Sequence, residues 1–425
     1  MKLLITNATV CDSQSAFNGK LCHVTITNGI ISQIVPAGKS KPSFTGKVFD
    51  AKGAWLMPGL VDMRASLREP GYEFKEDLQS AAKAAAAGGY TAIAALPDTL
   101  PVTETKSDIS FIKNKSADLP VDVLPYGAIT KALEGKEMNE LYDMHQAGAV
   151  GFSNANKSIM HAGVMMRAMM YAKIFNGLVL SHAEDTNLSA GGRMHEGNMS
   201  VQLGLKGNPN ISEEVMIARD IELARYTNAP VHFSHISSKG SVELIKKAKK
   251  QGLHITCDVA VAHLIFTDAN LESFDTNFKV NPPLRSKADQ KALWDGLADG
   301  TVDCIVSDHQ PQDVEHKIVE FEYASNGMSM LQTALPALFM HKPNTLSHQK
   351  LLEALTQSPR KILKQTPVSI AVGDQAELCI FDTKQQWELN EKTNLSKSSN
   401  NPFMGKTLQG KVLATIHNNQ LYKHS

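Results

Sequence analysis

Hydrophobic and polar positions divide this chain into a long middle region and two ends of a different texture. Residues 1–56 alternate short apolar and β-branched runs with turns, and Asn28-Gly29 between two of these runs is a strong hairpin signal. The same texture returns near the other end, interrupted by a polar stretch, Glu388–Asn400, that predicts a loop. In chain order the end runs are Leu3–Ile5, His23–Thr27, Ile31–Ile34, Val48–Asp50, Glu377–Phe381, Val412–Ile416 and Gln420–Tyr422. We therefore expect residues 1–56 and 365–425 to meet in one small β-sandwich domain; two separate β-extensions are the alternative.

The middle region, residues 57–364, alternates short apolar runs with helical patterns. The apolar runs predict eight strands: Leu60–Met63, Thr91–Ala95, Val121–Gly127, Ala149–Ser153, Leu178–Ser181, Val231–Ser234, Ile255–Asp258 and Asp303–Ser307. Helical patterns separate most of them, at Lys75–Ala87, Glu137–Gln146, Glu213–Tyr226 and Ser241–Gln251. Repeated strand–helix units imply parallel strands joined by right-handed crossovers, and this number of units predicts a closed (β/α)₈ TIM barrel. An open doubly wound sheet is the alternative, which the lack of a glycine-rich phosphate loop after the first strand disfavours.

Composition and charge narrow the class of protein. The chain has 425 residues, of which 42% are apolar and 20% charged, as is ordinary for a soluble globular protein. Lys+Arg and Asp+Glu both number 43, and this balance argues against nucleic acid or an anionic membrane as a general partner. The first residues are too polar for a signal peptide, and no apolar run reaches membrane-spanning length. The five cysteines have no paired spacing, which predicts reduced thiols and a cytoplasmic protein.

Side chains that can bind a metal follow three of the predicted strands. His182 follows the fifth strand, His235 the sixth and Asp308 the eighth. Because the strand ends on one face of a barrel converge, we expect these three side chains to lie close together. Imidazole and carboxylate ligands suit a divalent transition metal. The sequence therefore predicts an ancestral metal site at this face, with purely structural histidines as the alternative.

The segment from Pro58 to Gly71 carries the most specific signal. Its mostly apolar start predicts a buried strand, and its end, Leu67-Arg-Glu-Pro-Gly71, predicts a polar loop and a turn. The segment resembles the first-strand motif of the amidohydrolase superfamily, and Leu67–Gly71 narrows the resemblance to the dihydroorotases, specifically those that associate with aspartate transcarbamoylase in pyrimidine biosynthesis. The resemblance covers nearly the full length, through Leu96–Thr99, Gly191–Gly197, Leu203–Pro209, Asn281–Arg285, Gly373–Asp382 and Ser396–Phe403.

The resemblance implies a chemistry and a set of residues for it. In dihydroorotases a two-metal centre polarises a ring amide and generates a hydroxide, and an aspartate after the eighth strand shuttles the proton. Asp308 matches that catalytic aspartate, which also binds the first metal, while His182 and His235 match the histidines of the second metal. Arg68 and Asn281 match positions that hold the carboxylate and ring of dihydroorotate. These positions are intact.

Other positions of the family pattern are changed. The two histidines that hold the first metal are Arg64 and Ser66 in this chain. After the fourth strand, Asn154 stands where the family has an aspartate that bridges the metals, and Ser153 leaves no lysine to be carbamylated. Three further departures are Asp98 for a substrate-binding asparagine, Gln312 for a histidine, and Gln332 for the glutamate of the usual Gly-Leu-Glu-Thr.

These departures predict a degenerate homologue whose metal site is lost. An arginine does not deprotonate to become a ligand, and a guanidinium in the first-metal pocket repels a cation. Asp98 places a negative charge near the substrate carboxylate. We expect Arg64 to pair with Asp308, which would otherwise be a stranded buried carboxylate, rather than to lie along the barrel rim. The expected cofactor is none, or a single weakly held zinc on His182, His235 and Asp308.

Three functions remain open from the sequence. The first is a dihydroorotase-like pseudoenzyme of pyrimidine biosynthesis that lacks dihydroorotase turnover and serves as an assembly partner of aspartate transcarbamoylase. The second is an active cyclic-amide hydrolase acting on dihydroorotate or N-carbamoyl-aspartate with a reduced, one-metal site. The third is a protein that binds a small carboxylate ligand through Arg68 and Asn281. The resemblance also implies a homo-oligomer.

Overall fold

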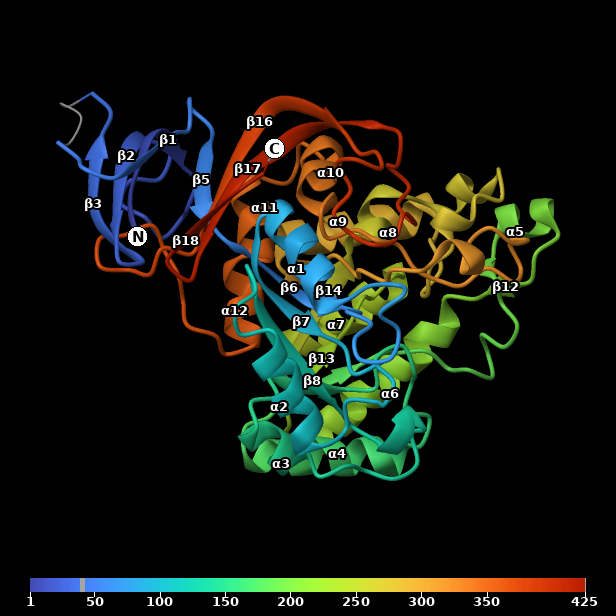
Figure 1. Ribbon diagram of the computed structural model, residues 1–425. Coiled ribbons are helices and arrows are strands. Elements are labelled where there is room, and N and C mark those ends of the chain that lie inside the picture. Colours follow the sequence, from blue (N-terminus) through green and yellow to red (C-terminus); the bar gives the residue numbers. More distant parts are fainter. Residues whose placement is uncertain (39–42, 425) are drawn as a thin grey trace.

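Eight parallel strands form the centre of the computed structural model, which describes residues 1–38 and 43–424 (Figure 1). In order around the sheet they are β6 (Leu60–Ala65), β7 (Tyr90–Ala95), β8 (Asp122–Ala128), β9 (Gly151–Ser153), β10 (Val179–Ser181), β13 (Val231–Phe233), β14 (Ile255–Ala260) and β15 (Cys304–Val306). The sheet closes where Ala65 bridges His309 and the Ser66 N–H donates to the His309 carbonyl at 2.8 Å. The predicted strands and the (β/α)₈ TIM barrel are confirmed.

The barrel strands form because their side chains are buried on both faces. Every residue of β6 and of β7 is buried, as is typical of parallel strands that are covered by helices outside and by the barrel interior inside. Four strands contribute Met63, Tyr126, Leu180 and Val306 to one apolar cluster. Burying a side chain of this size contributes about 1.5–3 kcal/mol. The polar residues at the strand ends are therefore held by a well-packed barrel.

Helices alternate with the strands and cover the outside of the barrel (Figure 1). They are α1 (Leu78–Ala87), α2 (Lys106–Lys115), α3 (Leu141–Gln146), α4 (Ala162–Ile174), α6 (Ile211–Thr227), α7 (Lys239–Lys250), α9 (Lys287–Asp299), α10 (Ala334–His341), α11 (His348–Leu355) and α12 (Gln357–Ile362). α1 begins later than the predicted Lys75 because the Asp77 carboxylate caps it, accepting from the Ser80 N–H at 2.7 Å. α3 also begins four residues later than predicted.

Short elements occupy the loops between these units. They are α5 (Asn198–Leu203), α8 (Val261–Ile265), the strand pair β11 (Met194–His195) and β12 (Gly207–Asn208), and the 3₁₀ turns η1 (Lys131–Leu133), η2 (Asp268–Leu271), η3 (Thr276–Phe278) and η4 (Val314–His316). Within the described residues, no helix is both long and apolar enough to cross a membrane. All five cysteines are unpaired, as their spacing predicted.

The two ends of the chain share a second sheet. Its strands are β1 (Lys2–Val10), β2 (Leu21–Thr27), β3 (Ile30–Pro36), β4 (Lys47–Asp50), β5 (Trp55–Pro58), β16 (Leu378–Glu388), β17 (Thr407–His417) and β18 (Gln420–Lys423). β5 and β16 pair antiparallel and so join the ends. Asn28 and Gly29 both take positive φ between β2 and β3, so the hairpin prediction is confirmed. The ends therefore meet as expected, and separate β-extensions are excluded.

Long strands link this sheet to the barrel. β16 and β17 extend from it as an arm, drawn in red in Figure 1, that reaches α10 and α1. The connection between them, residues 389–406, contains neither helix nor strand, which confirms the predicted loop. Its Asn400 side chain accepts from the Gln312 N–H at 3.1 Å and donates to the Gln310 carbonyl at 3.0 Å. The loop is therefore anchored to the segment that follows β15.

Candidate active site at the barrel mouth

The predicted site residues gather at the carboxyl ends of the barrel strands. Arg64 is the second-last residue of β6. His182 follows β10, His235 lies just beyond β13 and Asp308 follows β15. All four side chains are buried. The alternating direction of side chains along β6 directs Arg64 to the same face of the strand as Asp62, whose carboxylate accepts from the Arg64 N–H at 3.3 Å.

Arg64 and Asp308 form a buried ion pair. The Arg64 Nε donates to Asp308 Oδ1 at 2.8 Å, and the Arg64 side chain is only 1% exposed. Its Nη2 donates to Asn156, while Nη1 is buried and has no hydrogen-bond partner among the described residues. Gln310 adds a hydrogen bond to the same Asp308 oxygen at 2.8 Å. The predicted pair is confirmed, and the alternative in which Arg64 lies along the barrel rim is wrong.

The ion pair fixes the charge of Asp308. Burial alone would raise the pKa of this carboxyl, but the Arg64 guanidinium outweighs it and holds that pKa well below its usual range. Taking two charges out of water is expensive, and their mutual attraction offsets the cost only while both partners are present. Asp308 is therefore a permanently ionised partner of Arg64.

His182, His235 and Asp308 lie in a row. His182 Nδ1 is 2.8 Å from His235 Nε2, and the opposite nitrogen of the same ring, His235 Nδ1, is 3.6 Å from Asp308 Oδ2. Burial and then the charge of Arg64 lower the pKa of His235 to about 3, so that ring is neutral. Ligands of one metal point at one centre, whereas the two neighbours of His235 face opposite edges of its ring.

The ligand atoms confirm this difference. Within the described ranges, the set of three metal-binding residues whose ligand atoms come within 4.8 Å of one another is Asp122, Glu377 and His417, which lies at the other end of the barrel. The structure therefore brings His182, His235 and Asp308 into contact, but not into a common ligand set.

The residues at the first-metal position do not fit a two-metal centre. Arg64 presents only N–H donors there, and a guanidinium has no lone pair for a metal. Asn154, at the position of the bridging aspartate, is engaged elsewhere: its Oδ1 accepts from the Thr130 N–H at 3.1 Å and its Nδ2 donates to Thr130 Oγ1 at 2.7 Å. Ser66 donates to Asp98 at 2.8 Å. None of these groups is directed as a metal ligand.

Arg68 and Asn281, which match substrate-holding positions of the family, are already hydrogen-bonded to acids of the same chain. Arg68 Nη1 donates to Asp98 Oδ2 at 3.0 Å, and Arg68 Nε donates to the Pro311 carbonyl at 3.2 Å. Asn281 Nδ2 donates to Glu184 Oε2 at 3.0 Å. Asp98 was expected to lie near a substrate carboxylate; in the structure it takes that place itself.

Glu184 is a site residue to which the sequence analysis gave no role. Besides Asn281 it accepts from Asn208 at 3.2 Å and lies 3.3 Å from His182 Nε2. Burial alone would raise the pKa of Glu184, but the hydrogen bonds from His182 and Asn281 lower it to about 2. The sequence signal that could have identified Glu184 is its place two residues after a strand-end histidine.

A second layer of polar residues was also missed. His232 Nε2 lies 2.7 Å from Asp258 Oδ2, and the other oxygen of Asp258 accepts from the His235 N–H at 2.5 Å. Both side chains are fully buried. The signal was their polarity within otherwise apolar strands. This pair fixes the backbone that carries His235.

The two changed glutamines lie apart from the ion pair. Gln312 accepts from Lys75 Nζ at 2.7 Å and donates to the Asn326 carbonyl at 2.8 Å. Gln332 donates to the Thr393 carbonyl at 2.8 Å and accepts from the Leu395 N–H at 3.0 Å. Both therefore tie loops together rather than line the first-metal position.

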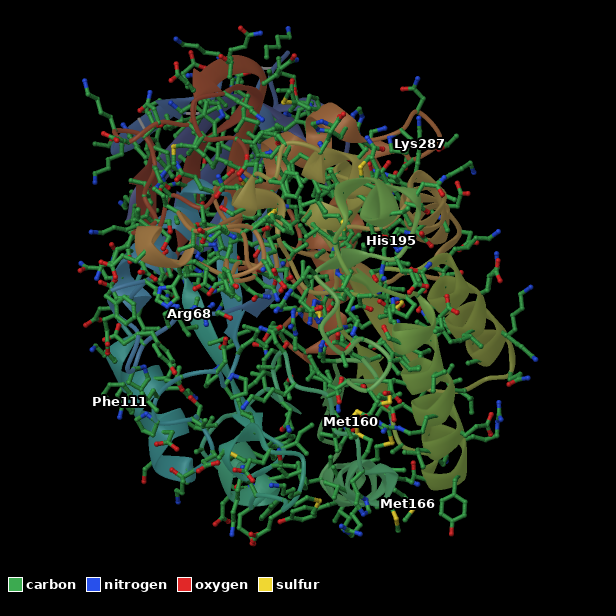
Figure 2. All side chains as sticks on the ribbon, turned by 90° about the vertical axis from the view of Figure 1, so that its right-hand side faces the viewer. Arg68, Phe111, Met160, Met166, His195 and Lys287 are labelled. Carbon is green, nitrogen blue, oxygen red and sulfur yellow. The ribbon has the colours of Figure 1, made fainter. Side chains whose placement is uncertain are left out.

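Figure 2 looks onto the side of the molecule that carries this mouth. Arg68 and His195 are labelled on different parts of the ribbon, Arg68 beside the early strands and His195 on the later loops. His195 is buried, its Nδ1 has no hydrogen-bond partner within residues 1–38 and 43–424, and burial lowers its pKa. The mouth is thus built from segments far apart in the sequence, which is the usual construction of a barrel site.

Comparisons with known proteins agree with this architecture. A family model described as dihydro-orotase-like matches residues 53–241. A dihydroorotase of Syntrophus aciditrophicus is 40% identical over 418 residues, covering 98% of both chains. One of Pelotomaculum thermopropionicum is 42% identical over 420 residues, covering 98% of this chain and 97% of that one.

Solved structures share the fold at lower identity. An L-hydantoinase (dihydropyrimidinase) of Arthrobacter aurescens superposes with a TM-score of 0.87 at 24% identity, covering 100% of this chain and 96% of that one. A dihydropyrimidinase of Brevibacillus agri gives 0.84 at 22% identity, covering 100% and 95%. At such identities the likeness concerns the fold alone. Because the sequence relatives match along nearly their whole length, the chain belongs to the dihydroorotase family of the amidohydrolase superfamily.

Proposed function

We propose that this chain is a dihydroorotase homologue that has lost dihydroorotase turnover and acts as an assembly partner of aspartate transcarbamoylase. The observation that carries the loss of turnover is the buried Arg64–Asp308 ion pair, with Nε and Oδ1 2.8 Å apart. The pair places a fixed positive charge where the family resemblance implies the first metal, and a cation is repelled from such a pocket.

The same pair removes the proton shuttle. A group that accepts a proton during catalysis works best with a pKa near the operating pH. The pKa of Asp308 is held far below that range by Arg64. His235, its other neighbour, also has a pKa lowered to about 3. Neither group takes up a proton readily at neutral pH.

Substrate recognition is weakened for a separate reason. Arg68 is already paired with Asp98, and Asn281 is already bonded to Glu184. A dihydroorotate carboxylate would have to displace Asp98 and then lie beside its charge. This arrangement also counts against the third function, a binding protein for small carboxylates.

The proposed partner rests on family membership. The resemblance is to those dihydroorotases that associate with aspartate transcarbamoylase, and the relatives match this chain over 98% of its length. A barrel that keeps its fold while its catalytic positions change is what an assembly role requires. We propose a homo-oligomer as the form that assembles.

Two measurements test the proposal. Purified chain is assayed for ring opening and ring closure with and without added zinc, and its metal content is measured. We expect no turnover and less than one zinc per chain. Stoichiometric zinc with measurable hydrolysis would overturn the proposal in favour of the one-metal hydrolase.

A matched variant makes the first measurement sharper. Arg64→His with Ser66→His and Asn154→Asp restores the family's ligand types at three positions. It is expected to gain tightly held zinc, which shows that the unaltered chain fails for want of ligands and not through misfolding. For the partner, sedimentation of the chain mixed with the aspartate transcarbamoylase of the same organism should give a complex; two unshifted boundaries contradict that part.

A further inference from the structure

A hollow of about 220 Å³ lies on the outside of the barrel, away from the strand-end site. The β16–β17 arm and β18 form one wall, the 389–406 loop another, and the end of α1 with the start of α10 the floor. Sites for small ligands usually span about 300–1,000 Å³. The enclosed part of the hollow is smaller than such a site, so a nucleotide bound there would lie partly in the open solvent.

Three lysines give this hollow its character. Lys392 comes from the loop, Lys411 from β17 and Lys423 from β18, and we call the hollow the lysine cleft. No carboxylate lies among its lining residues in the described part of the chain. None of the three ammonium groups enters any salt bridge formed by residues 1–38 or 43–424. A concave surface lined by one sign of charge concentrates ligands of the opposite sign.

Two further groups lie beside these lysines, and neither forms a salt bridge with them. Asp382 is the cross-strand neighbour of Lys411. Its carboxylate accepts hydrogen bonds from the backbone N–H groups of Lys384 and Gln385, at 2.9 and 3.2 Å. Lys423 lies 5.8 Å from the centre of the Phe49 ring, an uncharged neighbour.

One of the family departures lies in this lining. Gln332 stands where the family pattern has the glutamate of Gly-Leu-Glu-Thr, and it lines the lysine cleft. Its amide holds the loop by donating to the Thr393 carbonyl and accepting from the Leu395 N–H. A glutamate at this position would bring a carboxylate to the three lysines. The change to glutamine therefore removes a negative charge from the cleft.

The cleft also has an apolar side that suits a planar ring. Trp387 lines it, and its indole N–H donates to the Gly410 carbonyl at 2.8 Å, which fixes the orientation of the ring. Pro336, Leu395 and Val412 complete the apolar surface. An aromatic base stacked on such a ring contributes about 1–3 kcal/mol.

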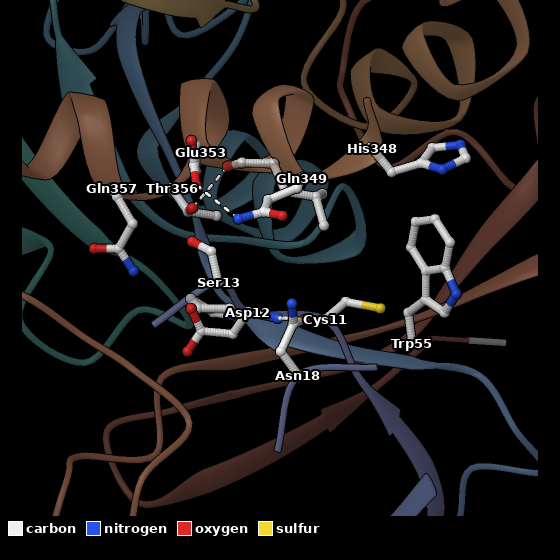
Figure 3. A pocket seen from close by; sticks show the side chains of 12 residues that line it. Cys11, Asp12, Ser13, Asn18, Trp55, His348, Gln349, Glu353, Thr356 and Gln357 are labelled. Atoms are coloured by element: carbon white, nitrogen blue, oxygen red, sulfur yellow. Dashed lines mark hydrogen bonds between the residues drawn. The ribbon is translucent and has the colours of Figure 1, made fainter. Parts of the chain in front are cut away.

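A second hollow serves as a contrast. The groove of about 140 Å³ between the sheet formed by the chain ends and α11, shown in Figure 3, includes the carboxylates of Asp12 and Glu353 and, in the described part of the chain, no lysine or arginine. Figure 3 also shows the hydrogen bond from Gln349 to Glu353, at 3.4 Å. Its Cys11 thiol is protonated, because burial raises its pKa to about 12. This groove therefore disfavours anions, whereas the lysine cleft favours them.

We propose that the lysine cleft binds a nucleoside polyphosphate. The phosphates lie among Lys392, Lys411 and Lys423, and the base lies against Trp387. This site is independent of the barrel mouth and holds whether or not dihydroorotate is turned over.

Calorimetric titration of the full chain at low salt tests the proposal, with ATP, tripolyphosphate and adenosine as probes. We expect saturable ATP binding that weakens as salt is raised, weaker tripolyphosphate binding, and no adenosine binding at the same concentrations. Trp387→Phe should weaken ATP while leaving tripolyphosphate unchanged, because only ATP carries a base. Tripolyphosphate bound as tightly as ATP would overturn the nucleotide assignment.

Charge variants locate the site. Lys392→Gln, Lys411→Gln and Lys423→Gln are each expected to weaken ATP about two- to fivefold, as exposed charge pairs usually do. The matched control is Lys287→Gln on α9, an exposed lysine at the edge of the molecule in Figure 2 that makes no salt bridge with a described residue. ATP affinities for the three cleft variants equal to that of the control would refute the site.

A reverse change adds an independent test. Gln332→Glu restores a carboxylate and should weaken ATP more than Gln332→Met, which removes the amide but adds no charge. Thermal melting of each variant verifies that the fold is kept. Equal affinities for the two Gln332 variants, or absence of saturable ATP binding to the unaltered chain up to millimolar concentration, would overturn the proposal.

Discussion

At the barrel mouth Arg64 and Arg68 each form an ion pair with an acid of the same chain, whereas the three lysines of the lysine cleft form no ion pair with any described residue. Arg64 is paired with Asp308 and Arg68 with Asp98, and both arginines are buried. The lysines 392, 411 and 423 line an open hollow without a carboxylate. Charges that are already neutralised internally hold a structure together, while uncompensated charges recruit a ligand. The barrel mouth has the properties of the first kind of region, and an outer surface has the properties of the second.

The largest effect is expected from breaking the buried pair. Asp308→Asn leaves Arg64 as an uncompensated buried charge, and the free energy of unfolding should fall by about 3–5 kcal/mol. Urea unfolding at neutral pH measures it. The control is Arg64→Met with Asp308→Leu, which removes both charges and is expected to lose less than the single variant. A single variant as stable as the unaltered chain would show that the pair contributes nothing.

A smaller effect is expected at the junction between the barrel and the β-domain. The buried His417 lies 3.2 Å from Asp122 and 3.4 Å from Glu377, and despite burial, which lowers it, these carboxylates raise its pKa to about 9. A histidine with a raised pKa stabilises the folded state below its unfolded value, about 6.5, and this stability is lost as pH rises through 9.

The loss should amount to about 2 kcal/mol between pH 6.5 and pH 9.5, discounted because Asp122 is half exposed. Thermal melting across this range measures it, and His417→Gln should flatten the profile. The control is His348→Gln, since burial lowers the pKa of His348 and gives it no such stabilising charge in this window. An unchanged profile in the His417 variant contradicts the assignment.

Removing the acid that pairs with Arg68 should make the barrel mouth more like the lysine cleft, with a cation available to a ligand. Asp98→Asn removes the internal partner, and a charge-assisted hydrogen bond to a ligand carboxylate then becomes available. We expect the affinity for N-carbamoyl-aspartate to rise about tenfold, still without turnover. Titration calorimetry measures it, with the distant Asp118→Asn as the control. Equal affinity in both variants would mean that Asp98 does not block the site.

The smallest effect should come from an exposed ion pair whose charged atoms are closer together than those of Arg64 and Asp308. Lys291 and Asp295 lie 2.6 Å apart on α9, with side chains 75% and 56% exposed. Lys291→Gln is expected to leave the unfolding midpoint unchanged within error, because water screens such pairs. A loss comparable to that of Asp308→Asn would show that burial is not what distinguishes the two.

The sequence predicted the barrel well and the site in part. The eight apolar runs lie where the strands are, because a strand buried on both faces is mostly apolar. Helix starts were misplaced where a cap such as Asp77 overrides the hydrophobic pattern. The Arg64–Asp308 pair was predicted from the family resemblance, which places both residues at one site, together with charge, because a buried carboxylate needs a cationic partner.

The remaining contacts depend on rotamers that no local pattern fixes. Asn154 turns to Thr130, and Glu184 collects Asn208 and Asn281 from loops that are distant in sequence. Such contacts arise only once the barrel brings those loops together. The domain limits, the transcarbamoylase partner and the homo-oligomer stay predictions, because a single chain does not test them.

The pairing of β5 with β16 sets an order on how the chain folds. Pro58 and Leu378 are cross-strand neighbours although about 320 residues separate them. During synthesis β1–β5 emerge first and are able to pair with one another, but β5 gains its partner β16 only after the whole barrel between them has emerged. Closing so long a connection from an unfolded chain costs entropy that grows only with the logarithm of its length, and a folded barrel shortens it further. The sheet formed by β1–β5 and β16–β18 is therefore expected to be completed last, on a barrel already in place.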